Sequence, residues 1–587
     1  MKKLFLGSLL ALMLALVHPL GYLKAEYESS RVPSVETSVA KGFKSSKMSQ
    51  EQSLIMGAMK RELDRSMAKL SLDDYPSPYF ISYLIRDKRE VSVTARYGAI
   101  FSFSDSKYRP SHIEVRVGTH ELDNSDKPSS AWRLDHGFPV DNDAAVIENR
   151  LWILTDLLYK KALAEYMNKK GKRAFKADEK VKVNDFSFED KQDFVGAKAS
   201  LAFDKEHWFG VLRRVSEVFL KHPELVYSQI EFDATEDTKY LVNSEGTTVV
   251  EGNTYYAIEV WAGAWSEDGM PLAHSVRYSC RDAGELPSET KMKSDIDEMI
   301  SELKLLRQTE EIKPCTVPAI FDPEMSSVLF HEAMGHRLEG DRQREDKEGH
   351  TFKNKVGEKV LPEFLTLIDN PTLPEYANTT LFGHYLYDDQ GVPGQKTILV
   401  EDGVLKNYLM SRRPIENFDN SNGHGRVCAK SGIGASLSAR MANLQVHSKN
   451  ELSRTDLEQR LIDECKKRGL DCGLIFVGTL GGHTNTDTYN YQAFLGKPKL
   501  VYKLNVSDGT RELVRGVNIV GTPLNTLEKV IATGNDYAVY NGYCGAESGM
   551  VPVSGIAPSI LLSEIEIQRI PDEKSRPPIL LPPAFDR

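Results

Sequence analysis

Residues 323–341 read PEMSSVLFHEAMGHRLEGD and hold the most informative signal of the chain. We expect a helix over about Pro323–His336, in a part of the chain that otherwise reads as short strands. Within it, His331 and His336 enclose Glu332, which directly follows the first histidine. Two imidazoles that bind a metal, with a carboxylate that takes a proton from the activated water, are the parts of a zinc peptidase site.

The interval between the two histidines differs from the common zinc-peptidase spacing. His-Glu-x-x-His places both rings on one helical face, whereas His331 and His336 lie five residues apart. At 100° per residue they would point about 140° apart on an ideal α-helix. Both reach one ion only if the helix widens or ends there, and Gly335 is where such a distortion costs least. The alternative is a chance pairing, with one histidine in the core or on the surface.

A zinc ion with one open catalytic position needs a third protein ligand. The metzincin extension requires a histidine six residues after the second ligand, but that position is Arg342. Cys544 is one candidate, because residues 541–545 read Asn-Gly-Tyr-Cys-Gly, and glycine on both sides of a turn lets the backbone approach closely. The alternative is a free cysteine in a loop.

The first residues have the layout of a secretory signal peptide. Lys2 and Lys3 are followed by an apolar run over residues 4–17, which is short for a membrane span of about 20 residues. We expect residues 1–25 to be a cleaved signal peptide and residues 26–47 a linker, and we expect the protein to be exported, to a periplasm or the cell exterior. No stable membrane insertion is expected after cleavage.

Composition excludes several classes of protein. The 587 residues are 41% hydrophobic and 27% charged, which is typical of soluble globular chains and unlike collagen-like, polytopic membrane or disordered ones. The net charge of −10 would become −13 without residues 1–25, which carry three lysines. An acidic chain is a poor candidate for binding nucleic acid, which needs a basic face.

The length predicts more than one domain. A composition shift near residues 314–323 suggests an N-terminal mixed α/β domain over residues 48–314 and a β-rich domain over residues 315–587, an α+β fold overall. Expected helices lie near residues 48–72, 143–170, 207–220, 294–306, 323–336, 455–468 and 525–532. Expected strands lie near residues 79–85, 91–97 and 113–117, with further short strands over 226–265.

Four stretches resemble, in the same order, the TldD/PmbA metallopeptidase family, also called modulators of DNA gyrase. The resemblance covers roughly residues 315–570. The stretches are 331–341, 388–395 with the strand–turn–strand that follows over 397–410, Arg-Met-Ala-Asn at 440–443, and 515–553 with its Cys-Gly and Val-Pro-Val segments. The resemblance implies that His331, His336 and Cys544 bind Zn²⁺, that Glu332 is the catalytic acid/base, and that residues 315–587 form a metallopeptidase domain.

The same resemblance implies a dimer, either a homodimer or a heterodimer with a TldD/PmbA-family partner. An enclosed cavity would admit peptides or unfolded protein segments. The family includes partner subunits that lack the metal motif, whereas this chain keeps every metal and acid/base position and resembles the active type. Its weakly matching first half and its predicted export depart from the family pattern.

Other residues carry weaker signals. Glu339 and Asp341 follow the second histidine, where they would hydrogen-bond a ligand ring or form a solvated turn. Arg412 and Arg413 suit a peptide carboxylate, although an ordinary surface pair fits as well. His483, in a Gly-Gly-His segment, fits a tight turn better than a fourth metal contact. Of the six cysteines, the best candidates for a disulfide are Cys465 and Cys472.

The sequence therefore favours an exported zinc peptidase in which Glu332 is the general base toward water. The alternative is a non-catalytic binding or assembly subunit of a TldD/PmbA-type complex with a structural metal. Structural zinc usually has four protein ligands, and only three are identifiable here. Direct modulation of DNA gyrase conflicts with the acidic charge and with export.

Overall fold

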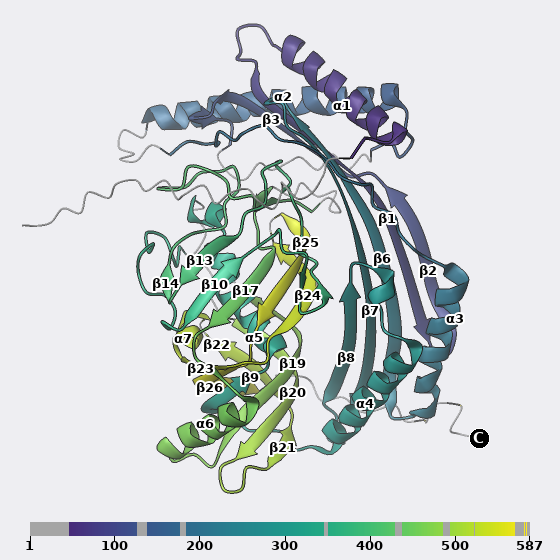
Figure 1. Cartoon of the computed structure of the whole chain (residues 1–587), viewed down its shortest axis with the longest axis vertical. Coiled ribbons are helices and arrows are strands. Elements are labelled where there is room, and N and C mark those ends of the chain that lie inside the picture. The colour runs from purple at the N-terminus through teal and green to yellow at the C-terminus, as the bar shows by residue number, and fades with distance from the viewer. Residues whose placement is uncertain are drawn as a thin grey trace, which may run out of the picture. The chain divides into compact units, whose positions relative to one another are not determined.

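A computed structural model describes residues 46–125, 138–175, 183–344, 350–428, 437–484, 486, 494–521, 523–546, 548–569, 580 and 583 (Figure 1). The predicted signal peptide, residues 1–25, and most of the predicted linker, residues 26–47, lie outside this set. No helix in the described ranges is both long enough and apolar enough to cross a bilayer.

The first half of the chain builds one sheet in the order β4-β3-β1-β6-β7-β5, with β2 paired to β1 and β8 paired to β7. Its strands are β1 (Pro78–Arg96), β2 (Ala99–Tyr108), β3 (Ser111–Thr119), β4 (Leu122–Asp123), β5 (Asp193–Val195), β6 (Leu225–Asn243), β7 (Thr248–Trp265) and β8 (Pro271–Cys280). Its helices are α1 (Gln50–Lys69), α2 (Ala144–Phe175), α3 (Lys205–Ser216) and α4 (Glu289–Gln308).

The long strands of this sheet have one apolar face and one polar face. α3 and α4 pack on the apolar face, where Val93, Phe232 and Ile258 are fully buried (Figure 1). On the polar face Arg86 pairs with Asp237 at 2.9 Å and also with Asp389, which belongs to the second half of the chain. Ion pairs of this kind make buried polar positions on a strand tolerable.

The predicted strands over residues 79–85, 91–97 and 113–117 are confirmed as strand up to Arg96, but the first two belong to the single strand β1. The predicted short strands over 226–265 are the long strands β6 and β7. Charged residues in these strands pair across the sheet, as Lys239 does with Glu251 at 3.3 Å. β2 and β8 were not predicted.

The second half is rich in strands, as predicted, and the helices and strands of the two halves together confirm the predicted α+β fold class. Lys44–Arg587 forms one compact unit by its contacts, so the division into domains at residues 314 and 315 stays a prediction. One sheet has the order β14-β13-β10-β17-β25-β24, from strands β10 (Leu365–Asp369), β13 (Thr397–Glu401), β14 (Val404–Leu405), β17 (Asn443–Ser448), β24 (Ala538–Ala546) and β25 (Gly549–Ala557).

The other large sheet closes on itself, because β9 pairs with both β19 and β26. Its strands are β9 (Cys315–Phe321), β18 (Glu451–Leu452), β19 (Cys472–Thr484), β20 (Phe494–Asn505), β21 (Arg511–Val514), β22 (Val517–Gly521), β23 (Val530–Gly534) and β26 (Ile560–Arg569). Two short hairpins pair β11 (Glu375–Tyr376) with β12 (Thr379–Thr380) and β15 (Gly425–Arg426) with β16 (Ser438–Ala439). The helices of this half are α5 (Pro323–Phe330), α6 (Arg454–Lys467) and α7 (Pro523–Glu528).

α5 lies between these two sheets and contacts β19, β20, β24 and β25. It begins after Asp322, whose carboxylate accepts the Met325 N–H at 2.9 Å, and Pro323 occupies the first turn, where its missing N–H is not needed. The helix is buried on all sides, which is typical of a helix enclosed by a core. The predicted helix over residues 525–532 was partly wrong, because α7 ends at Glu528 and β23 follows.

The described residues form no disulfide, so Cys465 and Cys472, the best candidates in the sequence, are not paired with each other. A Cβ added at Gly473 would lie 3.0 Å from the Cys465 Sγ, so position 473 faces α6. Adjacent residues of a strand point to opposite faces, and Cys472 therefore points away from Cys465.

The packing of α5 on β25 gives a stability test. A Cβ at Gly555 would lie 1.8 Å from the Ser327 Oγ, so we expect Gly555→Ala to lose about 1–3 kcal/mol through overpacking. Ser327→Gly removes the clash, because the next atom is the Ser327 Cα at 3.9 Å. In a double-mutant cycle followed by thermal unfolding, the combined variant should lose less than the two single variants together. Strictly additive losses would contradict this packing.

Candidate metal centre

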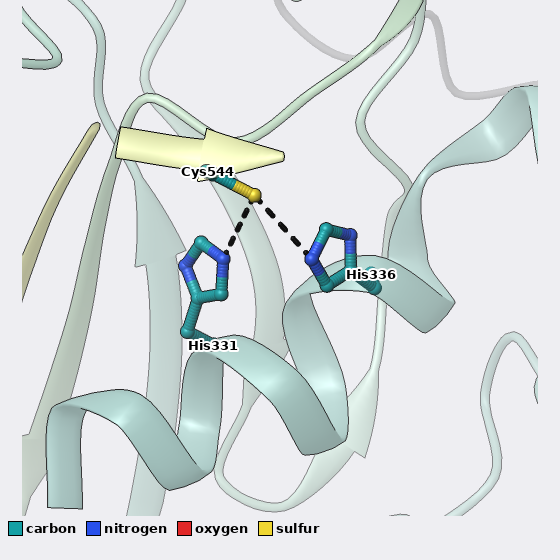
Figure 2. Close-up of side chains that lie close together, drawn as sticks. All are labelled: His331, His336 and Cys544. Atoms are coloured by element: carbon teal, nitrogen blue, oxygen red, sulfur yellow. Dashed lines mark hydrogen bonds between the residues drawn. The ribbon is translucent and has the colours of Figure 1, made fainter. Parts of the chain in front are cut away.

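The helical stretch that carries both histidines changes its geometry at the first of them. α5 ends at Phe330, and His331–Gly335 is a turn of π-helix in which the His336 N–H bonds to the His331 carbonyl five residues earlier. This wider turn brings both rings to one side, with centroids 5.0 Å apart and planes at 89° (Figure 2). The structure thus has the widening that the five-residue spacing requires.

Gly335 is needed for space and not for its dihedral freedom. Its φ of −51° and ψ of −58° are ordinary helical values, so the expectation of an unusual conformation there was wrong. A Cβ at this position would lie 1.9 Å from the Met441 Sδ and 3.2 Å from its Cγ. The glycine therefore lets the widened turn pack directly on the segment that holds Met441.

Cys544 comes from the other side of the centre. It lies within strand β24, not in the turn that its glycine neighbours suggested, and β24 is hydrogen-bonded to β25. Its Sγ is 3.0 Å from the His331 Nε2 and 3.4 Å from the His336 Nε2 (Figure 2). The structure therefore gathers the two histidines and the distant cysteine in one place.

These three residues fit a zinc ion. Their donor atoms all lie within 4.8 Å of one another. A tetrahedral site with Zn–S near 2.3 Å and Zn–N near 2.0–2.1 Å separates nitrogen from sulfur by roughly 3.5 Å. The two observed N···S distances need to lengthen by only a few tenths of an ångström. Two imidazoles and one thiolate are zinc ligands that leave a fourth position open.

Glu339 fixes the orientation of the second histidine. Its Oε1 lies 3.1 Å from the His336 Nδ1, which leaves Nε2 to point toward Cys544. Burial raises the pKa of Glu339, but the charges of His336, Arg342 and Arg440 outweigh it and bring that pKa down to about 2. The carboxylate is therefore charged, as a partner of a ligand imidazole should be.

Electrostatics favour the thiolate form of Cys544. Burial raises the pKa of the thiol, but His336, His331 and Arg440 together lower it well below its usual range. The pKa of each histidine is in turn raised despite burial, chiefly by the charge of Cys544. The thiolate is the species that binds metal.

Glu332 lies on the π-turn beside the ligands. Its Oε2 is 4.0 Å from the His336 Nε2, and its side chain is 12% exposed. The carboxylate is thus close to the convergence point of the three donors without being one of them. That placement suits a group that exchanges protons next to an ion.

The other residues singled out from the sequence lie apart from the three ligands. Asp341 accepts hydrogen bonds from the Ser411 hydroxyl and the Ala439 N–H, so its predicted contact with a ligand ring was wrong. His483 is exposed on β19, at a bulge in that strand and not in a tight turn.

The interpretation of Arg412 and Arg413 as a surface pair was also wrong, because both are buried. Arg412 forms a bidentate pair with Glu245 at 2.6 and 2.9 Å and lies 3.9 Å above the Phe186 ring. A peptide carboxylate is therefore not needed to balance its charge.

Arg440 lies beside the centre, although no role was predicted for it from the sequence. It follows β16, is fully buried, and donates to the Cys544 carbonyl at 2.7 Å and to its Sγ at 3.0 Å. Its only signal in the sequence was its place in the Arg-Met-Ala-Asn stretch of the family resemblance.

The sequence is similar to those of known metalloproteases. Residues 314–569 match the family model of the PmbA/TldA metallopeptidase C-terminal domain. A metalloprotease of Archaeoglobus fulgidus is 32% identical over 41% of this chain and 51% of its own length. A zinc metalloprotease TldD homolog of Saccharolobus solfataricus is 25% identical over 46% of this chain and 57% of its own. The chain thus spans about half the length of these curated relatives.

The fold extends beyond that region. A crystal structure from Thermotoga maritima, described as a modulator of a DNA gyrase, superposes with a TM-score of 0.58 over 87% of this chain and all of its own. The two sequences are only 16% identical. This likeness shows that the first half of the chain, which the family model does not cover, shares the fold of such proteins.

The role of Glu339 can be tested against that of Asp341. We expect Glu339→Gln to weaken zinc binding about 10–100-fold, because the His336 ring loses its charged partner. Asp341→Asn is the matched control, since that carboxylate contacts Ser411 and Ala439 and no ligand. Competition with a chromophoric chelator measures both affinities, and thermal unfolding checks the fold. Equal zinc affinity in the two variants would contradict the role of Glu339.

Proposed function

We propose that this protein is a zinc-dependent peptidase that hydrolyses peptides or unfolded protein segments, because residues 314–569 match the PmbA/TldA metallopeptidase C-terminal domain. The observation that carries the proposal is the convergence of His331, His336 and Cys544, with Glu332 beside them. The names of the relatives, metalloprotease and zinc metalloprotease, support the same reaction and the same metal.

Each residue of the centre would have its own role in the reaction. His331, His336 and Cys544 would hold the ion, and the Glu339 carboxylate would keep the His336 ring in place. When bound, zinc supplies a Lewis acid that polarises the scissile carbonyl and makes water acidic enough to react near neutral pH. Glu332 would accept the proton of the attacking water and return it to the leaving amine.

Compartment and assembly are also proposals. The apolar run at residues 4–17 after two lysines supports export to a periplasm or the cell exterior. The family supports a dimer, with a second copy or with a TldD/PmbA-family partner. The acidic charge supports neither a nucleic-acid partner nor action on a DNA-bound enzyme.

Metal content is the first test. We expect about one zinc per chain in the purified protein and a strong loss in Cys544→Ala, because removing the thiolate leaves two ligands. Elemental analysis measures both. A parent protein without metal at neutral pH, or a variant that keeps all of it, would refute the three-ligand assignment.

A test of the catalytic role of Glu332 distinguishes an enzyme from a binding subunit with a structural metal. We expect Glu332→Gln to keep zinc and the fold but to lose about 10²–10⁴-fold in turnover of a fluorogenic peptide mixture. Glu324→Gln is the control on the preceding helix, where Glu324 pairs with Lys499 at 3.2 Å, and it should stay close to the parent. A zinc-loaded parent that cleaves neither peptides nor unfolded protein would favour the binding subunit.

A further inference from the structure

Arg440 contacts both sides of the centre. Its Nη2 donates to the Cys544 Sγ at 3.0 Å, and its Nε lies 3.4 Å from the Oε1 of Glu339. That same carboxylate oxygen is 3.1 Å from the His336 Nδ1. The Arg440 guanidinium thus contacts the Cys544 sulfur directly. It is connected to the second ligand, His336, through the Glu339 carboxylate.

The rest of the side chain is held rigidly. Its Nη1 donates to the Ser548 hydroxyl at 2.7 Å and to the Gly549 carbonyl at 2.9 Å, and its Nη2 also donates to the Cys544 carbonyl. The residue is 0% exposed. A planar guanidinium that is held at both Nη atoms can direct an N–H toward the sulfur, which a flexible ammonium group does less well.

Charge balance explains why the sulfur needs this contact. A guanidinium is always charged, and a buried charge is costly unless it is paired. Glu339 is the nearby carboxylate, but it is shared with Arg342 at 2.7 Å and with His336. The Cys544 thiolate, on strand β24, places a second negative charge beside the Arg440 guanidinium.

We propose that Arg440 is a positioning residue that presents the Cys544 thiolate to the metal through an N–H···S hydrogen bond and couples it to the Glu339–His336 pair. Such a bond draws electron density from the sulfur, so the thiolate donates less to the ion and the ion stays a stronger Lewis acid. The proposal rests on the proposed zinc site. It adds a residue that acts through the ligands, without touching the substrate.

The test uses the full chain loaded with Co²⁺, whose sulfur-to-metal charge-transfer band reports on the thiolate. We expect Arg440→Gln to move this band to lower energy, because the sulfur loses its hydrogen bond. Metal binding should weaken about 10–100-fold, because the loss of a fixed position for the thiolate outweighs its stronger donation to the ion. Arg440→Lys keeps the charge and one donor nitrogen. Its band energy and its metal affinity should therefore fall between those of the parent and those of Arg440→Gln.

Two controls separate this role from a merely structural one. Arg412→Gln removes an equally buried arginine whose partners are Glu245 and Ser187, so its band and metal affinity should match those of the parent. Arg342→Gln removes an arginine that bonds to Glu339 and Thr486, and it should weaken binding without moving the sulfur band. Circular dichroism and thermal unfolding check that each variant is folded.

An unchanged band in a folded Arg440→Gln or Arg440→Lys protein would overturn the proposal while leaving the zinc site intact. If neither variant folds, a crystal structure of the zinc-loaded parent decides. An Arg440 Nη2 beyond hydrogen-bond reach of the Cys544 Sγ would overturn the proposal there. A parent that takes up no metal would instead refute the proposed function itself.

Discussion

The two histidines lie five positions apart in the sequence, and an ordinary α-helix would turn their rings away from each other. The chain resolves this constraint with one π-turn directly after α5, and the neighbouring structure is fitted to that turn. Asp322 and Pro323 fix where the helix begins, the enclosed core fixes its axis, and the glycine at position 335 lets the turn lie against Met441. A π-turn is less favourable than α-helix, so it persists because the surrounding packing holds it.

Buried charge is the second organising feature. The polar face of the first sheet carries ion pairs that reach the loops of the second half, as Arg86 does with Asp389 and Arg412 does with Glu245. Removing one member of such a pair leaves an uncompensated buried charge, whereas an apolar contact can be trimmed at lower cost. These ion pairs therefore favour one way of packing the first sheet on the metal-binding half over other ways.

The sequence predicted the centre better than the sheets. The histidine spacing by itself indicated a local distortion. The glycine-flanked segment made Cys544 one candidate, and the family resemblance identified it as a ligand. The length of strands β6 and β7 was not predicted, because the partners of their charged residues lie on other strands. The burial of Arg412 was missed for the same reason, since Glu245 stands 167 residues away in sequence. Arg440 stood in the resembling stretch, but its role depends on contacts that only the fold creates.

The separation of the ligands along the chain has a consequence for stability. Cys544 is 213 residues from His331, and an unfolded chain would have to close a loop of that length to bring them together. Packing contributes to meeting this entropic cost, because the π-turn and strand β24 contribute Ala333, Met334 and Cys544 to the same hydrophobic core. A metal would add to the stability of the native state by its preference for this geometry over the scattered ligands of the unfolded chain.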